Sequence, residues 1–87
     1  MSESRLLIAV EVLDFLRTLR AREQQQLLRR FREIALFPSN FADFVEHDAA
    51  GRHLGVHVFG KFAIKFWDDL ADRHVKILDL HFADRPR

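Results

Sequence analysis

The chain has 87 residues and no cysteine, which leaves room for one domain, residues 1–87, and excludes a disulfide framework, a zinc ribbon and thiol chemistry. Its 14 Lys and Arg residues nearly balance 13 Asp and Glu, so the net charge of +1 indicates no general affinity for polyanions, and any such site must be local. The apolar run at residues 6–10 is too short to span a membrane, and Glu11 and Asp14 follow it where a secretion signal would be apolar. We therefore expect a soluble, cytoplasmic protein that does not enter membranes.

The first half of the chain predicts one strand and two helices. Residues 5–10 are short and apolar, and we interpret them as a strand. Apolar residues then recur at helical spacing over residues 12–19, the pattern of a short amphipathic helix. The same pattern predicts a longer helix over residues 21–37, which ends there because Pro38 disfavours helical geometry at the residue before it.

The second half predicts antiparallel strands. Residues 41–48 are one strand candidate, and apolar residues alternate with polar ones over residues 54–58 and again over residues 62–66. Between the last two segments, Gly60 and Lys61 predict a tight hairpin turn in which glycine supplies a positive φ angle. Two neighbouring strands are therefore joined by a two-residue connection.

A final strand follows a polar run. Residues 68–73 supply turn chemistry, residues 74–82 resume a β-rich pattern, and the polar end at residues 84–87 predicts a mobile tail. Together the elements predict an α+β fold, in which an N-terminal strand and a two-helix hairpin pack on one face of an antiparallel sheet of about three to five strands. The opposite face of the sheet is left open.

Strand alternation predicts which polar side chains point away from the helices. We expect His57, Lys65 and Trp67 to face outward from the central strands, and Asp79 and His81 to join them from the last strand. The apolar residues expected to face the helices are Val56, Val58, Phe62, Ile64, Phe66, Leu78, Leu80 and Phe82.

The predicted open face thus carries imidazole, ammonium and carboxylate groups. Such a set could bind a phosphodiester, because cations stabilise the charge gained in the transition state and a histidine or carboxylate can move a proton. The alternative is a solvated face or a groove for a protein partner. Asp79, His81 and His57 also offer the donor types of a zinc or manganese site. No spacing signature supports such a site, so we predict neither a metal nor a cofactor.

Two stretches of the chain resemble the bacterial RelE/ParE toxin superfamily of type II toxin-antitoxin systems. One is the helical hairpin that runs into Phe37 and Pro38; the other covers residues 51–69 and 74–85. In the family, a hairpin of the form G-[K/R]-aromatic-x-I-x-aromatic leads to a last strand ending near H-x-x-R. The first element is matched by GKFAIKF at residues 60–66, and the second by HFADR, one residue longer than the pattern.

The resemblance implies a RelE-like toxin that inhibits translation by ribosome-dependent cleavage of messenger RNA. Such an mRNA interferase is a metal-independent endoribonuclease, is neutralised by a cognate antitoxin and belongs to systems associated with plasmid stabilisation in bacteria. Two alternatives stay open at this point. One is a ParE-like inhibitor of DNA gyrase, and the other is a protein-binding module of the same fold without catalysis.

The resemblance also implies catalytic residues. Arg52 and Lys65 are expected to stabilise phosphate charge, and Glu46 and His81 are expected to transfer protons. Many RNA-cleaving members carry a tyrosine beside the histidine, whereas this chain has Phe82 there and no tyrosine at any position.

Further residues are expected to make contacts rather than to catalyse. Lys61, Arg85 and His57 are expected to bind nucleic acid. Trp67 is expected to be exposed and to anchor a protein partner, because aromatic side chains surrounded by polar residues are typical energetic centres of interfaces. That partner is either the antitoxin or a second copy of the chain in a homodimer.

Overall fold

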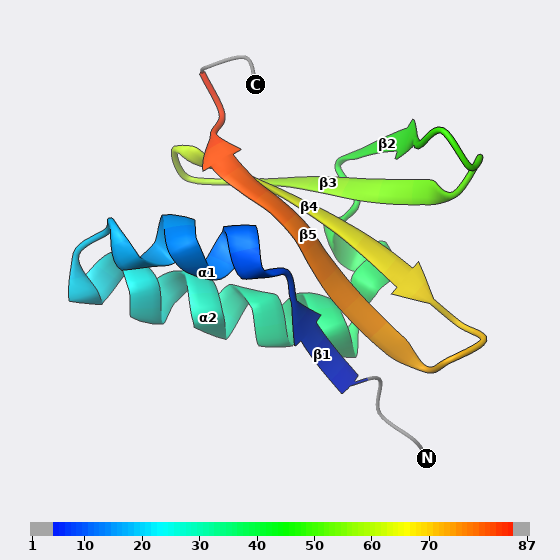
Figure 1. Cartoon of the computed structure of the whole chain (residues 1–87), viewed down its shortest axis with the longest axis horizontal. Helices are drawn as coiled ribbons and strands as arrows, with labels where there is room; N and C mark the ends of the chain where they lie inside the picture. Colours follow the sequence, from blue (N-terminus) through cyan, green and yellow to red (C-terminus); the bar gives the residue numbers. More distant parts are fainter. Residues whose placement is uncertain (1–4, 85–87) are drawn as a thin grey trace.

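The structure is a computed structural model that describes residues 5–84, and in it two helices lie against a five-stranded sheet (Figure 1). The elements in chain order are β1 (Arg5–Ile8), α1 (Val10–Arg17), α2 (Ala21–Leu36), the 3-10 helix η1 (Pro38–Phe41), β2 (Phe44–His47), β3 (His53–Phe59), β4 (Phe62–Asp69) and β5 (His74–Phe82). The predicted order of one strand, two helices and further strands is confirmed. Of the expected tail, residues 84–87, the structure describes Asp84, whereas Arg85 and residues 86–87 lie outside the described residues.

The sheet has the strand order β1-β5-β4-β3-β2. Strands β2 to β5 are antiparallel neighbours, as predicted, whereas β1 pairs with β5 in parallel. The α+β fold is confirmed, but the sheet is mixed rather than fully antiparallel. The chain leaves β1 into the helical hairpin and re-enters the sheet at its opposite edge, so no tight turn couples the direction of β1 to its neighbour.

Helices α1 and α2 cover one face of the sheet and bury its apolar side chains (Figure 1). The stripe predicted for the longer helix is confirmed, since Leu27, Phe31 and Ile34 have 0% of their surface exposed. Helix α2 ends at Leu36, one residue earlier than predicted, and Pro38 begins η1. The buried core comprises Val12, Leu16, Leu27, Phe31, Ile34, Ala35, Phe62, Ile64, Phe66, Val75, Ile77 and Leu80.

The face predicted for β3 is wrong. Directly opposed residues of antiparallel strands point to the same face, and His57 lies opposite Ile64 while Val56 lies opposite Lys65. Ile64 is fully buried under the helices. His57 therefore lies on the helix side of the sheet, and Val56 and Val58 lie on the open side.

His57 tolerates burial because its ring has polar and aromatic partners. Its Nδ1 lies 3.0 Å from Oδ2 of Asp43, and the same oxygen accepts a hydrogen bond of 2.8 Å from the backbone N–H of Val58. The ring of Phe41 meets the imidazole edge-on, with centroids 5.1 Å apart. These contacts tie the segment between η1 and β2 to β3.

Replacing Asp43 with alanine should lower the free energy of unfolding at neutral pH by about 1 to 3 kcal/mol, because the buried imidazole loses its partner. The Val58 N–H, and after it His57, lowers the pKa of Asp43 below its ordinary value of 3.8. A carboxyl group whose pKa is lowered on folding stabilises the fold above that ordinary value and loses this contribution as the pH falls below it. The difference in melting temperature between wild type and the Asp43→Ala variant should thus be largest at pH 7 and become smaller below pH 3.8.

Asp14→Ala is the matched control for this pH series. Asp14 forms an exposed surface ion pair with Arg17, at 3.2 Å, and its loss should change stability by only a few tenths of a kcal/mol. If Asp43→Ala and wild type differ by the same amount at every pH, the carboxylate does not contribute through its charge.

A bulge in β5 changes which of its residues face the core. The pairing register shifts between Lys65 and Phe66 of β4, so that Leu78 has no partner there. Leu78 is half-buried and does not belong to the core defined above, contrary to the prediction. On one side of the bulge Val75 and Ile77 are fully buried. On the other side the predicted helix-facing residues are confirmed, namely Leu80 and Phe82.

Candidate functional site on the open face of the sheet

The face of the sheet opposite the helices, which we call the open face, brings together several predicted site residues. Lys65 lies opposite Asp79 in the register of β4 and β5, and its Nζ is 2.8 Å from Oε1 of Glu46 on β2. His81 follows Asp79 by two residues and so shares its face. We call Glu46, Lys65, Asp79 and His81 the Lys65 cluster.

Within this cluster, Asp79 orients the imidazole of His81. The His81 Nδ1 lies 2.7 Å from Asp79 Oδ2. Because an ionised carboxylate only accepts hydrogen bonds, Nδ1 carries the proton in this pair, and Nε2 is left to exchange a proton with a bound molecule. The two side chains keep 27% and 15% of their surface exposed, so the pair is sheltered but reachable. This geometry suits general acid-base chemistry.

Lys65 and Glu46 supply the opposite charges of the cluster. The Lys65 side chain is 21% exposed and that of Glu46 is 52% exposed. Partial burial of the ammonium group strengthens its attraction for an anion, while the more exposed carboxylate can move away or accept a proton.

Arg52 is held at the margin of the open face. Its guanidinium carbon lies 4.4 Å from the ring centroid of Trp67, and its Nε forms an ion pair with Asp48. The backbone N–H of Arg52 is the main cause of the lowered pKa of Asp48. Trp67 thus lies on the open face as predicted, with one face of its ring covered by Arg52.

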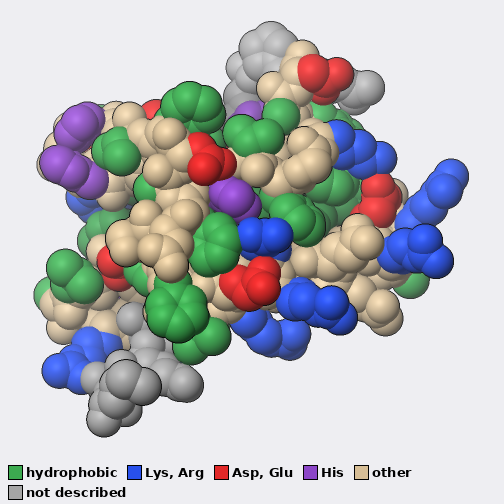
Figure 2. Space-filling view, turned by 180° about the vertical axis from the view of Figure 1, so that it is seen from behind, with side chains coloured by type: hydrophobic (Ala, Val, Ile, Leu, Met, Phe, Trp, Pro, Cys, Tyr) green, Lys and Arg blue, Asp and Glu red, His purple; other side chains and the backbone are tan. Residues whose placement is uncertain are grey.

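The open face is balanced in charge, since each basic residue predicted on it is paired with a carboxylate. The pairs are Lys65–Glu46, Arg52–Asp48 and His81–Asp79. A phosphate group would therefore have to displace a carboxylate to reach any of these three residues. Figure 2 shows the opposite, helix-bearing side of the molecule, where basic side chains gather over the helices with a few acidic side chains among them.

Lys76 is an open-face cation that the sequence analysis missed. It lies opposite Trp67 in the register of β4 and β5. Among residues 5–84 no carboxylate lies within ion-pair distance of its ammonium group. The bulge at Leu78 reverses the alternation along β5, so a strict period of two counted back from His81 puts Lys76 on the wrong face.

Two other predicted nucleic-acid contacts lie away from the open face. His57 lies on the helix side, as described above. Lys61 forms an ion pair of 2.8 Å with Glu23 of α2. The hydrogen bond that the Lys61 ammonium group donates to the carboxylate lowers the pKa of Glu23. Its Nζ also lies 5.6 Å from the ring centroid of the core residue Phe62. The third predicted contact, Arg85, is outside the described residues.

The metal donors considered from the sequence do not converge, because His57 is on the opposite side of the sheet from Asp79 and His81. Within the described part of the chain, Asp69, Asp72 and His74 have potential ligand atoms within 4.8 Å of one another. Asp69 accepts the backbone N–H of Asp72 at 3.3 Å, an ordinary turn contact that accounts for this grouping.

Comparisons with known proteins show what the fold resembles. No model of a known protein family matches the chain, and no curated protein matches it. Among solved structures, it is similar to a chain of the archaeal RelE-RelB complex from Pyrococcus horikoshii OT3, with a TM-score of 0.79 and 18% sequence identity over 98% of this chain and 100% of the other. No helix within residues 5–84 is long and apolar enough to cross a membrane. The chain has a RelE-like α+β fold.

Proposed function

We propose that this chain is the toxin of a type II toxin-antitoxin system, a RelE-like endoribonuclease that inhibits translation by cleaving messenger RNA on the ribosome. The observation that carries the proposal is the Lys65 cluster, in which a sheltered lysine, a carboxylate and an oriented histidine meet on the open face. The RelE-like fold supports the same class of function.

In the proposed reaction the RNA supplies the nucleophile. The 2′-hydroxyl oxygen bonds to phosphorus while the bond from phosphorus to the 5′-oxygen breaks, which leaves a 2′,3′-cyclic phosphate and a 5′-hydroxyl group. Glu46 accepts the proton of the 2′-hydroxyl, and protonated His81 gives a proton to the 5′-oxygen through Nε2. The ammonium group of Lys65 exchanges its ion pair with Glu46 for one with the phosphate. It then stabilises the negative charge that the non-bridging oxygens gain. The step needs no metal or cofactor.

The absence of tyrosine is compatible with this mechanism because Phe82, the residue beside His81, packs against the core on the helix side of the sheet. Phe82 lies opposite Phe62, on the helix side of the sheet, and the two rings stack with centroids 5.5 Å apart. Phe15 of α1 meets Phe82 edge-on at 5.3 Å. The residue beside His81 therefore faces away from the Lys65 cluster, so proton transfer rests on Glu46 and His81.

We propose a cognate antitoxin as the partner that keeps the toxin inactive. Phe44 lies opposite Val56 and thus on the open face, and it is 61% exposed on the edge strand β2. Val58 on the same face is 42% exposed. An antitoxin segment that covers these apolar side chains would also cover Glu46 and keep RNA from the Lys65 cluster. Phe44 is a more accessible anchor than Trp67, whose ring is covered by Arg52.

Induced expression in a bacterial host tests the function directly. We expect growth to stop, pulse labelling to show loss of protein synthesis, and primer extension to show messenger RNA cut within translated regions, while plasmid supercoiling stays unchanged. Purified protein should cut ribosome-bound RNA equally well with and without EDTA. Altered supercoiling with intact RNA would instead identify a gyrase inhibitor, and normal growth with neither effect would leave a binding module without catalysis.

A further inference from the structure

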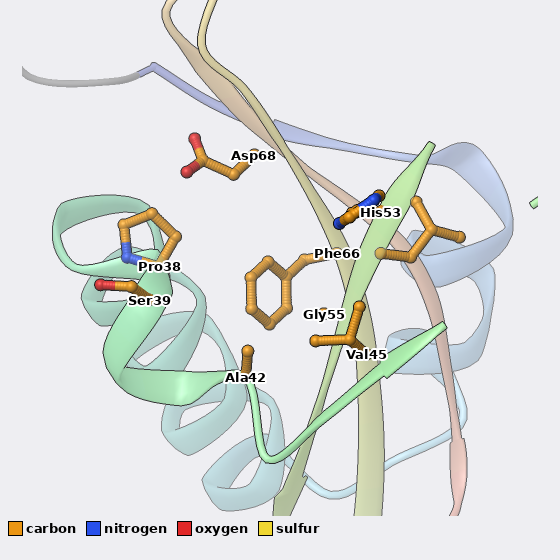
Figure 3. A pocket seen from close by; sticks show the side chains of 9 residues that line it. Pro38, Ser39, Ala42, Val45, His53, Gly55, Phe66 and Asp68 are labelled. Atoms are coloured by element: carbon orange, nitrogen blue, oxygen red, sulfur yellow. The ribbon is translucent and has the colours of Figure 1, made fainter. Parts of the chain in front are cut away.

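A small pocket lies on the helix side of the sheet, where η1 faces β3 and β4 (Figure 3). Its volume is about 170 Å³. Figure 3 shows the ring of Phe66 between Pro38 and Ser39 on one side and Gly55 and Val45 on the other. We call this the Phe66 pocket. It is on the opposite side of the sheet from the Lys65 cluster.

The position of the Phe66 ring in this pocket depends on Gly55, which has no side chain. A Cβ atom built at this position would lie 2.4 Å from Cζ of Phe66, closer than atoms can approach. Glycine therefore lets the aromatic ring lie flat against the backbone of β3 and form an apolar floor. Val45 and Pro38 add apolar walls.

Asp68 places a carboxylate on the wall of this mostly apolar pocket. Burial, together with the negative charge of Asp69, raises its pKa. Among residues 5–84 no basic side chain lies within ion-pair distance of Asp68. An apolar floor with an uncompensated negative charge is complementary to a side chain that has an aliphatic stem and a cationic end.

The edge of the sheet beside the pocket can receive an extended chain. β2 is the outermost strand, and Val45 on it is 56% exposed. The Asp48 N–H donates to the Arg52 carbonyl at 3.1 Å, and because hydrogen-bonded pairs alternate along an antiparallel ladder, the backbone polar groups of Val45 point away from β3. They are thus placed to bond a further strand, as in strand addition at sheet edges.

We propose that the Phe66 pocket binds an arginine or lysine side chain carried by an extended segment of a partner protein that pairs with the free edge of β2. The stem of the side chain lies on the ring of Phe66, and its cation pairs with the carboxylate of Asp68. The proposal does not depend on RNA cleavage, because the pocket and the Lys65 cluster occupy opposite faces.

Titration of the isotopically labelled protein with short capped peptides, followed by amide chemical shifts, tests the proposal. The probes are acetyl-Val-Arg-Val-amide, the same peptide with citrulline in place of arginine, and the single residue acetyl-arginine-amide. Citrulline keeps the shape of arginine but has no charge. We expect the arginine tripeptide to shift the amides of Ser39, Val45 and Gly55 and to bind at least about tenfold more tightly than the citrulline peptide.

The variant Asp68→Asn keeps the shape of the side chain. It should lower the affinity of the protein for the arginine peptide to its affinity for the citrulline peptide. It should fold normally, since it removes a charge that burial disfavours, and its melting temperature checks this. Asp72→Asn, an exposed change in the neighbouring turn, should leave binding unchanged. Equal affinities of the two tripeptides, or an unchanged affinity in Asp68→Asn, would overturn the proposal. So would no binding at all, or equally tight binding of the single residue, which would favour a small-molecule site.

Discussion

Replacing His81 with alanine should slow RNA cleavage by about 10²- to 10⁴-fold, the usual cost of removing a positioned proton-transfer group. In the proposed mechanism its Nε2 protonates the leaving oxygen, while Asp79 holds Nδ1 at 2.7 Å. Lys65→Ala should cost about 10²- to 10³-fold, because a charge-stabilising group is lost. Both effects are measured as single-turnover rates on ribosome-bound messenger RNA, and both variants should lose growth inhibition.

His47→Ala is the matched control for these variants. His47 is exposed and pairs with His53, with ring centroids 4.4 Å apart, and its side chain points to the face opposite that of its neighbour Glu46. This variant should cleave at the wild-type rate, and antitoxin binding should be retained in all three. Unchanged toxicity in both His81→Ala and Lys65→Ala would show that the open face is not the catalytic site.

The second large effect concerns the core. Phe31→Ala should lower the free energy of unfolding by about 3 to 5 kcal/mol, since the side chain is 0% exposed and its removal leaves a cavity between α2 and the sheet. That loss is a large fraction of the roughly 5 to 15 kcal/mol that stabilises a domain of ordinary size. Urea denaturation followed by circular dichroism measures it.

Phe37→Ala serves as the comparison, because Phe37 follows the same helix but is 59% exposed. Its replacement should change stability by less than about 1 kcal/mol. A similar loss in both variants would mean that the effect comes from helix propensity and the end of α2 rather than from burial. A small loss in both would mean that α2 does not pack on the sheet as described.

The helices could be predicted from the sequence because their signals are local. The apolar stripe around Phe31 has helical spacing, and Pro38 ends the pattern within the same segment. The same holds for the turn at Gly60, whose observed φ of 60° is the positive angle expected there. None of these predictions requires knowledge of a distant partner.

The face of β3 was mispredicted even though the turn beside it determines it. A two-residue turn at Gly60 and Lys61 makes Phe59 and Phe62 direct partners, so they share one face. Since Phe62 is in the core, Phe59 and every second residue before it, including His57, must lie on the helix side. Apolar character favoured the valines as the helix-facing residues instead. That inference failed because Asp43 supplies a partner for the buried imidazole of His57.

The site was predicted only in part, for a related reason. Lys65, Asp79 and His81 share the open face as expected because they lie on neighbouring strands on one side of the bulge, and Glu46 of β2 reaches Lys65 across β3. Lys76 was missed because the bulge at Leu78 depends on how β5 packs against β4, and no residue type in the segment marks it. Pairings such as Lys61 with Glu23 join distant segments and leave no local trace.

The parallel pairing of β1 with β5 has a consequence for how the protein is made. Arg5 of β1 pairs with His74 of β5. β1 is therefore synthesised before the other strands but has no strand to pair with until β5 has been synthesised. During synthesis the helical hairpin can form early from local contacts, but its apolar stripe stays uncovered until β4 and β5 emerge. The strand that completes the sheet also carries Asp79 and His81. A chain that has not yet reached β5 therefore lacks a complete core as well as Asp79 and His81, and any activity of the site begins only after β5 has been synthesised.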